Sequence, residues 1–451
     1  MIGSGRRITL SAAVLAVTLG VTNAYAATPT TFETIGPANY EVTDMSADGT
    51  VLVGTFSFGG PAFRWTRLGG VEFIGGNGGG IKISADGSVI SGNVDVNGHN
   101  EAALWLGGEN WQPLGGLGTT GCPDFSNGYD VSGNGQVIVG LGWFGCGAHG
   151  FRWEQGTGMV DLGRLGPGSY SRANAVNFDG SVIVGWDDSL FDRRGARWVN
   201  GVESLLADVP GNEIYMGSAE ATTPDGLIVV GGEAGMPGDE IYEEAYIWTE
   251  GQGGKLIGKL PGGGAFARAF AYAISDDGSL VAGGSGGQFR LGFLWSATTG
   301  MINFQDYLLA LGVTGLDGWT LGNVRTMSAD GTKMAGWGVN PDGLLQGWLV
   351  ENLPALADTD LDSVFDALDN CSEEANVDQR DTNGDGFGNI CDPDLNNDGA
   401  INVLDLGLMK AVFFSADADA DLDGDGVVNV VDLGIMKARF FGEPGPSGLV
   451  Q

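Results

Sequence analysis

The amino-acid sequence predicts a mainly β protein: a seven-bladed β-propeller, then a small segment of metal-binding loops, then a small α-helical domain with two further loops. Three observations support this fold class. A motif built on an Asp-Gly turn occurs seven times between residues 46 and 336. Acidic residues occupy every second position from Asp358 to Asp362. The 17-residue stretch that begins at Asp394 is nearly repeated from Asp421.

The first 26 residues have the pattern of a secretory signal peptide. Arg6 and Arg7 precede the short apolar run ITLSAAVLAVTLGV, and Ala24-Tyr25-Ala26 is a small-x-small cleavage site. An uncleaved anchor is the alternative, but the apolar run is short for a membrane span. We therefore expect an exported protein, secreted or at the cell surface, without a transmembrane anchor after signal cleavage.

The net charge of −35 limits the classes of partner. A strongly acidic surface repels nucleic acid and anionic membranes, and it attracts cations. Four cysteines form two local pairs, Cys122 with Cys146 and Cys371 with Cys391. An even count at close spacing in an exported chain predicts disulfides. For the first pair, a metal site that includes His149 is the alternative.

Residues 27–355 contain the repeat and are the predicted propeller. Each copy places an Asp-Gly or Asn-Gly turn before a short apolar run that ends in glycine, and a tryptophan follows. The seven copies begin SADGTVLVG (Ser46), SADGSVISG (Ser84), SGNGQVIVG (Ser132), NFDGSVIVG (Asn177), TPDGLIVVG (Thr223), SDDGSLVAG (Ser275) and SADGTKMAG (Ser328). Such a turn between apolar runs indicates a hairpin, and the unit has room for about four strands, as in a propeller blade.

The last copy lacks the strand that follows the tryptophan in the other six. The segment TFETIGP, which begins at Thr31, resembles that strand and has no repeat before it. We therefore expect residues near 31–36 to complete the seventh blade and close the ring. The repeat tryptophans should pack between blades, because large aromatic side chains supply much of the buried area. The turn-and-tryptophan pattern resembles the HAF-type extracellular repeat family, which implies an exported propeller-like domain and no particular activity.

From Leu356 onward the chain has 21 acidic and 4 basic residues. Asp358, Asp360 and Asp362 alternate along the chain, as do Asp381, Asn383 and Asp385. Alternation on a curled backbone directs several oxygens at one centre, and oxygen ligands at this density favour Ca²⁺. A segment with so few apolar residues would depend on bound ions for its fold.

Residues 356–393 resemble thrombospondin type 3 repeats, with "DNC" and "GNICD" as the specific parts. The resemblance implies that Cys371 pairs with Cys391. It also implies further residues close to Ca²⁺, namely Asp366, Asp369, Asn370, Asp378, Asn389 and Asp392. Ser363 replaces the glycine that is usual in the first loop, so the sequence predicts an ion there less strongly than in the other loops.

The stretch from Asp394 has the ligand order of an EF-hand loop, with Asp in place of Glu at position 12. The first loop offers Asp394, Asn396, Asp398, the Ala400 carbonyl, Asn402 and Asp405, and the second offers Asp421, Asp423, Asp425, the Val427 carbonyl, Asn429 and Asp432. A helical pattern follows each loop, with Leu404, Leu408 and Val412 on one face, and we expect the two helices to pack on each other. Two complete loops in tandem predict two Ca²⁺ ions.

Loop followed by helix, twice over residues 394–441, resembles a type I dockerin. The resemblance implies docking to a cohesin-type receptor in assemblies that degrade polysaccharide. It places the receptor contacts on Val403, Leu404, Lys410, Ala411, Val430, Val431, Lys437 and Ala438. The apolar pairs among these residues fit a buried core equally well. Residues 442–451 are rich in Pro and Gly, and we expect them to be disordered.

Catalytic residues cannot be assigned from the sequence. The G-x-S-x-G match at Gly283–Gly287 lacks the helix that a nucleophile elbow needs. Glu101, Glu220 and Glu243 are merely available. Two function classes remain: a non-catalytic exported protein whose propeller binds a glycan or a protein, and a glycoside hydrolase or lyase with a catalytic propeller. Two acids with an Arg or Tyr in the channel would favour the enzyme, whereas a channel of small residues would favour binding.

Overall fold

The computed structural model describes residues 28–450, except 58, 109, 119–124, 167–169, 189–192, 208–214, 233–243, 263–266 and 288–289. The predicted signal peptide, residues 1–26, lies outside the described residues. The described chain is mainly β, as predicted, with three short α-helices. Its strands form five four-stranded sheets and one eight-stranded sheet, all antiparallel between neighbours.

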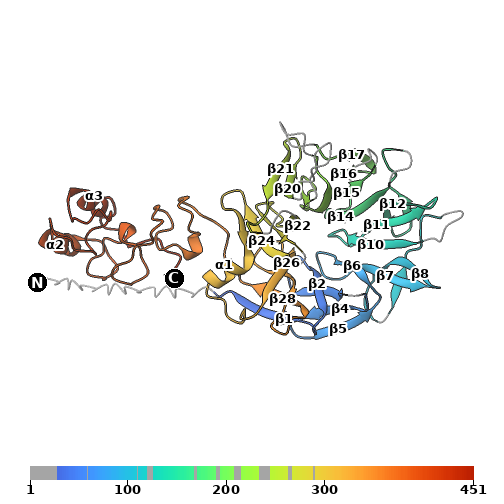
Figure 1. Cartoon of the computed structure of the whole chain (residues 1–451), viewed down its shortest axis with the longest axis horizontal. Helices are drawn as coiled ribbons and strands as arrows, with labels where there is room; N and C mark the ends of the chain where they lie inside the picture. Colours follow the sequence, from blue (N-terminus) through green and yellow to red (C-terminus); the bar gives the residue numbers. More distant parts are fainter. Residues whose placement is uncertain are drawn as a thin grey trace, which may run out of the picture.

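The strands follow the sequence repeat, in seven units of four (Figure 1). The first strands are β2 (Tyr40–Met45), β6 (Asn77–Ile83), β10 (Ser126–Val131), β14 (Ser171–Val176), β18 (Ser218–Thr222), β22 (Arg268–Ile274) and β26 (Thr320–Met327). The second strands are β3 (Val51–Phe56), β7 (Ile90–Val96), β11 (Val137–Phe144), β15 (Val182–Asp187), β19 (Ile228–Gly232), β23 (Leu280–Gly286) and β27 (Met334–Val339). The third strands are β4 (Ala62–Thr66), β8 (His99–Trp105), β12 (Gly147–Glu154), β16 (Arg194–Val199), β20 (Ala245–Thr249), β24 (Leu291–Ser296) and β28 (Leu345–Glu351). The fourth strands are β5 (Gly70–Gly75), β9 (Trp111–Pro113), β13 (Gly158–Asp161), β17 (Val202–Leu205), β21 (Gly253–Gly258), β25 (Gly300–Asn303) and β1 (Thr31–Ile35). A single pair, Gly232 with Phe270, joins the fifth and sixth units into the eight-stranded sheet.

The repeated Ser-x-Asp-Gly motif makes the turn between the first and second strands. In the first copy, the Ser46 hydroxyl donates to Asp48 Oδ1 at 2.7 Å, and the Val51 amide donates back to Ser46 Oγ at 3.0 Å. Gly49 has φ = 65°, a backbone conformation that glycine adopts without strain. The motif is therefore a hydrogen-bonded turn, and its repetition sets the strand spacing.

In six of the seven copies, the glycine that ends the apolar run is required by close backbone approach. A Cβ atom on Gly54 would overlap the carbonyl oxygen of Glu41, and one on Gly140 would overlap that of Asn127. Both carbonyls belong to the first strand of the same unit. The repeat keeps glycine here because the second strand crosses an irregular part of the first strand.

The N-terminal strand completes the last sheet, as the sequence predicted. β1 pairs with β28 from Thr31↔Glu351 to Ile35↔Gly347. Ile35 is fully buried, in a cluster shared with the first unit. Arg67, which follows β4, forms ion pairs with both Glu33 and Glu351. Residues more than 300 positions apart in the sequence are thereby held together.

The turns of neighbouring units are linked by backbone hydrogen bonds. Ala47 donates to the carbonyl of Ala85 at 2.9 Å, and Ala329 donates to that of Ala47 at 2.8 Å. Equivalent bonds link the other neighbouring turns, except between the fifth and sixth units. Pro224 occupies the donor position there, and proline has no amide hydrogen.

Six of the seven repeat tryptophans are buried, which agrees with packing between units. They are Trp105, Trp153, Trp198, Trp248, Trp295 and Trp348, while Trp65 is half-buried.

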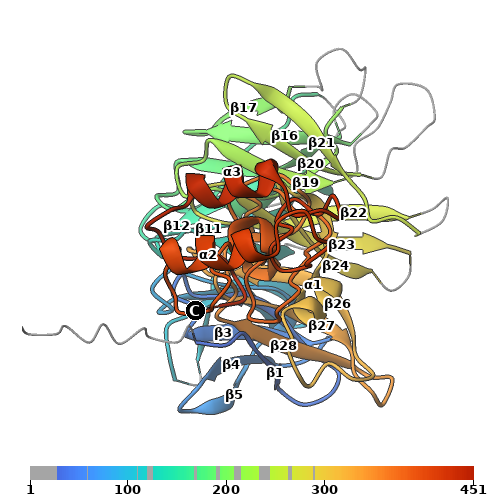
Figure 2. The same ribbon diagram turned by 90° about the vertical axis from the view of Figure 1, so that its left-hand side faces the viewer.

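The C-terminal part packs beside α1 (Phe304–Ala310), as Figures 1 and 2 show. Phe365 meets Tyr307 edge-on, with 5.4 Å between ring centroids. This part contains two 3-10 turns, η1 (Asp366–Leu368) and η2 (Asn389–Cys391), and two helices, α2 (Val403–Ala411) and α3 (Val430–Ala438). None of the described helices is long and apolar enough to cross a membrane.

The predicted packing face of the two C-terminal helices was wrong in part. Leu404 and Leu408 are exposed, and the buried helix residues are Met409 and Met436 with their capping aspartates. Each helix has only nine residues, so its core is completed by loop residues. The buried members of this cluster are Ile401, Met409, Ala420, Leu422, Val428 and Met436.

The expectation of a disordered C-terminus also differs from the structure. Residues 442–450 run across the acidic segment and donate backbone hydrogen bonds to it, from Gly445 to the Cys391 carbonyl at 3.1 Å and from Gly448 to the Asp369 carbonyl at 2.8 Å. Ser372 donates in return to the Pro446 carbonyl at 3.0 Å. Because these contacts use the backbone, the sequence pattern gave no sign of them.

Candidate metal sites and the central cavity

The loop from Asp394 is closed by its two end carboxylates. Asp394 Oδ2 accepts the amide of Gly399 at 2.6 Å. Asp405 accepts the amides of Asn396 at 3.2 Å and Asn402 at 2.8 Å. Asp394 and Asp405 are buried, at 2% and 0% exposure. Asp405 also completes the capping box of α2 with Asn402, so one residue ties the loop to the helix.

The loop from Asp421 repeats the same geometry. Asp421 Oδ2 accepts the amide of Gly426 at 2.9 Å, and Asp432 accepts those of Leu422 and Asn429, each at 2.7 Å. Carboxylate oxygens of Asp421, Asp423 and Asp432 lie within 4.8 Å of one another. Two stretches of similar sequence thus fold into the same loop twice, and each contains the predicted ligand positions.

A second cluster of carboxylates lies at the start of the acidic segment. Oxygens of Asp358, Asp360 and Asp362 lie within 4.8 Å of one another. Three carboxylate oxygens nearby are buried without a hydrogen-bond partner in the described structure: Asp358 Oδ1, Asp360 Oδ2 and Asp369 Oδ2. A buried, unpaired carboxylate oxygen is costly, so this arrangement fits a cation held by oxygen ligands.

Most of the other predicted ligands fall into two groups, and the remaining one, Asp378, is exposed. Asn383 donates to Asp385 Oδ2 at 3.1 Å and to Asp392 Oδ2 at 3.4 Å, so these three side chains meet. Asp381 turns its carboxylate to the amides of Gly384 and Gly386 in the same loop. In contrast, Asp366 accepts from Thr359 with both oxygens, and Asn370 and Asn389 are bonded to protein groups. The last three have structural partners.

Cys371 and Cys391 form the disulfide that the resemblance implied, with Cα atoms 5.7 Å apart. Cys122 lies outside the described residues, so its pairing with Cys146 stays a prediction. His149 Nδ1 donates a hydrogen bond to Asp161 Oδ2 at 2.9 Å, and its ring lies against Phe144.

Burial and neighbouring carboxylates disfavour the ionised form of several aspartates in these loops. Burial, with the charges of Asp385 and Asp394, raises the pKa of Asp392 to about 7. Burial likewise raises the pKa of Asp360, Asp369, Asp405 and Asp423, and nearby aspartates add to it. A bound cation would reverse this effect, because an opposite charge favours the ionised carboxylate.

All eight residues of the predicted receptor contacts are exposed. Val403 is 66% exposed and Val430 is 70% exposed, and Leu404 and Val431 beside them are also exposed. The alternative that these apolar pairs form a buried core is therefore wrong. The apolar positions recur on both helices, so the exposed surface is duplicated as the sequence is.

The first strands of all seven units line one central cavity of about 230 Å³. In six units, the pairing of the first strand with the second skips one residue. We call these the bulge residues: Thr43, Tyr129, Asn174, Glu220, Tyr272 and Arg325. A β-bulge redirects side chains. Here a bulge residue and the residue after it line the cavity together in the fifth, sixth and seventh units.

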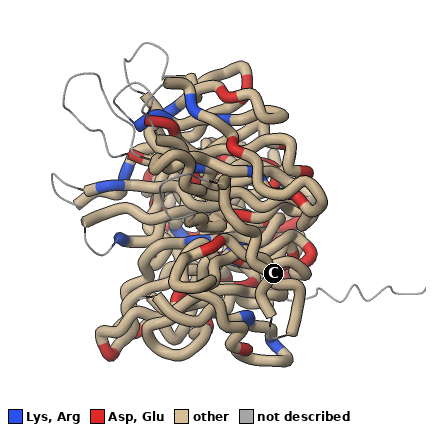
Figure 3. Tube along the Cα trace, turned by 90° about the vertical axis from the view of Figure 1, so that its right-hand side faces the viewer, with Lys and Arg blue, Asp and Glu red and all other residues tan. Residues whose placement is uncertain are grey.

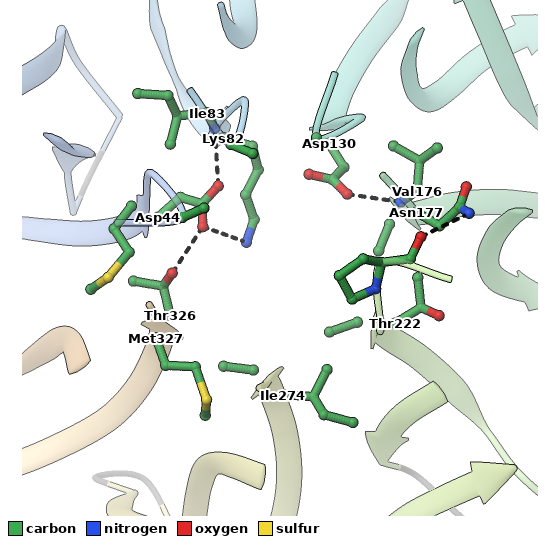
Figure 4. Close-up of a pocket in the computed structure, with 18 of the residues that line it drawn as sticks. Asp44, Lys82, Ile83, Asp130, Val176, Asn177, Thr222, Ile274, Thr326 and Met327 are labelled. Carbon is green, nitrogen blue, oxygen red and sulfur yellow. Dashed lines mark hydrogen bonds and ion pairs between the residues drawn. The ribbon is translucent and has the colours of Figure 1, made fainter. Parts of the chain in front are cut away.

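The residues that follow the bulges differ around the cavity (Figure 4). Asp44 accepts the amide of Ile83 at 2.9 Å in the next unit, and Lys82 lies 3.7 Å away. Asp130 accepts the amide of Val176 at 2.8 Å in the same manner. Burial raises the pKa of Asp130 to about 7, although Lys82 opposes this. Ala175, Ala221 and Ala273 occupy the equivalent positions on the opposite side.

Sequence reasoning named Glu220 only as available and missed the rest of this cavity. The signal was present, because the positions four and five residues before each turn aspartate vary in charge while their neighbours stay apolar.

The G-x-S-x-G match lies in β23, where buried Ser285 accepts the amide of Leu260 at 2.9 Å. The tryptophans Trp186 and Trp319, outside the repeat position, are buried. Glu243 lies outside the described residues.

Comparison with known proteins matches only part of the chain to a family. The model of the thrombospondin type 3 repeat family matches residues 357–379 and 380–406. The second match includes the whole loop from Asp394 to Asp405. A comparison with curated proteins gave no match.

Solved structures resemble part of this chain. TolB from Acinetobacter baumannii is 13% identical, with a TM-score of 0.33, over 57% of this chain and 52% of its own. The β-propeller domain of the Trilobed protease from Pyrococcus furiosus is 10% identical, with a TM-score of 0.44, over 70% and 95%. An oligogalacturonate lyase from Vibrio parahaemolyticus is 11% identical, with a TM-score of 0.43, over 72% and 98%. At these values the likenesses carry no functional argument.

Proposed function

We propose that this is an exported calcium-binding protein. Each four-stranded unit is one blade of a seven-bladed propeller that binds a ligand, and the C-terminal part is a calcium-dependent module that tethers the propeller to a partner. Ca²⁺ would be held by the loops from Asp358, Asp394 and Asp421. The ion supplies positive charge to buried carboxylates there, and the protein supplies the oxygen ligands.

The observation that supports calcium binding most strongly is the set of buried carboxylate oxygens without partners. Asp358, Asp360 and Asp369 each bury one such oxygen. The donors are oxygens alone, which is the ligand type that Ca²⁺ takes in proteins. The loop from Asp421 adds three convergent carboxylates at EF-hand positions, and Asp394 makes the same hydrogen bond in its loop as Asp421 does.

The tethering role is supported by the exposed helix surface. Val403 and Leu404 on α2 match Val430 and Val431 on α3, and all four are exposed, as is Leu408 on α2. Apolar residues repeated on a surface favour a protein partner over water. We propose a cohesin-like or cell-surface protein as that partner, bound through either copy of this dockerin-like surface.

A second candidate function is cleavage of polysaccharide by the propeller. Its supporting observation is that Asp44, Asp130 and Glu220 line one cavity with Tyr272 and Arg325. Two acids with an Arg or Tyr are the combination that favours an enzyme, and the raised pKa of Asp130 suits a general acid. Asp44 and Asp130 also have anchoring roles, so we place binding first.

The test of calcium binding is an equilibrium titration of the full-length protein. Asp394→Asn and Asp421→Asn should each remove or weaken one site, because both place a carboxylate at position 1 of a loop. Asp306→Asn on α1 is the matched control, since Asp306 lies in the first turn of a helix outside the loops. Equal calcium binding by all four proteins would contradict the loop assignment.

The test of the propeller is a panel of polysaccharides offered to the full-length protein. Retention without release of sugars supports ligand binding. Release of sugars supports the enzyme, and the variants Asp130→Asn and Glu220→Gln should then abolish it. If the protein neither retains a polysaccharide nor releases sugars from it, the search should turn to protein ligands.

A further inference from the structure

Three arginines of the propeller have no carboxylate partner among the described residues. Arg172 lies on β14, Arg325 lies on β26, and Arg290 directly precedes β24. Each is half-buried. All of the contacts that the structure gives these side chains are with aromatic rings or neutral polar groups.

The contacts hold each guanidinium in place. The Arg172 guanidinium carbon lies 5.0 Å from the ring centroid of Tyr129, and its Nε donates to Asn174 at 2.5 Å. It also lies 5.4 Å from the ring of Trp186. A guanidinium stacked on an aromatic face keeps its donors free at the edge of the plane.

The other two arginines share one aromatic side chain. The Arg325 guanidinium lies 4.1 Å above the ring of Tyr272, and Arg290 lies 4.4 Å above the ring of Phe270. Phe270 and Tyr272 are stacked, and Arg290 donates to the Tyr272 hydroxyl. Two cations are therefore packed against one aromatic pair.

Many of the other arginines in the described part of the chain have acidic partners. The chain has 56 acidic and 21 basic residues, and basic residues are sparse along the trace in Figure 3. Elsewhere in the described part, Arg67, Arg152, Arg197, Arg380 and Arg439 all pair with carboxylates. Arginines left without an acid in so acidic a protein indicate a site for an external anion.

The cavity wall has a second feature that suits a carboxylate. Asp44 and Asp130 each accept an amide of the next unit. The equivalent residues in the fourth, fifth and sixth units are alanines. Within the described residues, no side chain accepts from the matching amides, those of Thr222, Ile274 and Met327. An incoming carboxylate has room on this alanine side.

The acidic residues of the cavity do not cancel this preference. Asp44 is engaged by the Ile83 amide, the Thr326 hydroxyl at 3.0 Å and Lys82. Asp130 bonds to an amide and carries only part of its charge near pH 7. Glu220 accepts from Ser218 at 2.6 Å and Asn174 at 3.3 Å. These three acids have partners within the protein, and the pKa of Asp276, which also lines the cavity, is raised by burial and by the neighbouring Asp277.

We propose that the central cavity, with Arg325 at its wall and Arg290 bonded to the lining residue Tyr272, binds a ligand that carries carboxylate groups. The inference rests on the proposed ligand-binding role of the propeller and names the chemistry of that ligand. Arginine forks pair with carboxylates through two parallel hydrogen bonds, which favours this anion by geometry as well as charge. A uronate saccharide and a small organic dicarboxylate share this chemistry.

The experiment is calorimetric titration of the full-length protein in buffer with Ca²⁺. The probes are digalacturonate, succinate and the neutral disaccharide cellobiose. Saturable binding of digalacturonate alone supports a saccharide source, and binding of succinate supports an organic-acid source. Equal binding of cellobiose, or no binding of either carboxylate, would overturn the proposal.

Variants localise the site. Arg325→Gln and Arg290→Gln should each weaken binding at least about tenfold, because a charge-assisted bond is lost. Arg172→Gln tests whether the site extends to the arginine beside Tyr129 and Asn174, and it keeps the proposal open to refutation if the first two variants do not fold. Arg325→Lys keeps the positive charge and loses the paired N–H donors of the guanidinium, so it should weaken binding less than Arg325→Gln does. Arg152→Gln, on the paired arginine of β12, is the control and should bind as the wild type does.

Unchanged affinity in Arg172→Gln, Arg290→Gln and Arg325→Gln, with thermal unfolding like that of the wild type, would overturn the proposal. This failure is distinguishable from failure of the proposed function. Calcium binding is measured in a separate titration. If the protein retains neutral polysaccharides, the propeller still binds a ligand, but the proposal that this ligand carries carboxylates is wrong.

Discussion

The substitution Ile35→Ala tests how far the N-terminal strand stabilises the propeller. Ile35 is fully buried against Val42, Leu52, Phe63, Ala335 and Leu349. Truncation of such a residue costs about 2–5 kcal/mol, from lost burial and the cavity that remains. A domain of ordinary stability has about 5–15 kcal/mol in total, so the loss would be a substantial fraction.

Urea unfolding followed by tryptophan fluorescence is the assay. All twelve tryptophans lie at or before Trp348, so the signal reports the propeller and excludes the C-terminal part. Ile35→Val should cost only about 0.5–1.5 kcal/mol, which provides a graded control. Deletion of residues 31–37 should lower the free energy of unfolding more than either substitution, because it also removes the pairing with β28. An unfolding midpoint unchanged by the deletion would refute a structural role for this strand.

Three further predictions concern the glycines that lie against a neighbouring backbone, the aspartate of the repeated turn, and the C-terminus. Gly140→Ala should lower the free energy of unfolding by about 1–3 kcal/mol, because its Cβ overlaps the Asn127 carbonyl, whereas Gly287→Ala has open space and should change little in the same urea assay. Hydrogen bonds from Thr50 and Ser46 hold the pKa of Asp48 below its ordinary value, so its stabilisation is present above about pH 4 and is lost as the pH falls further. Asp48→Asn should therefore lose less thermal stability between pH 6 and pH 3 than the wild type; an identical loss would contradict this. Removal of residues 443–451 should destabilise the C-terminal part by about 2–4 kcal/mol through three lost backbone hydrogen bonds, seen as earlier loss of far-ultraviolet dichroism, and no change would contradict the role of the tail.

The repeat predicted the strands well because its signals are local. An Asp-Gly turn and a β-branched run specify a hairpin by themselves, and the missing strand of the last copy pointed to Thr31–Ile35. The EF-hand spacing likewise placed Asp394 and Asp405 at the two ends of one loop. The disulfide of Cys371 with Cys391 followed from family resemblance.

The features that sequence reasoning missed depend on three-dimensional irregularities. The bulges that turn Tyr272 and Arg325 toward the cavity wall arise from a register shift between strands, which no periodicity reveals. The exposure of Leu404 was mispredicted because a nine-residue helix completes its core with loop residues such as Ile401. The order of residues 442–450 depends on backbone contacts, so the composition of that segment was uninformative.

Hydrogen exchange of the full-length protein, with Ca²⁺ and after its removal by chelator, tests the central claim most directly. The apolar core of residues 357–450 is small, so its amides should be protected with Ca²⁺ and exchange fast without it. The amides of β1 to β28 should be unaffected. Equal protection of residues 357–450 in both conditions would contradict a calcium-dependent module.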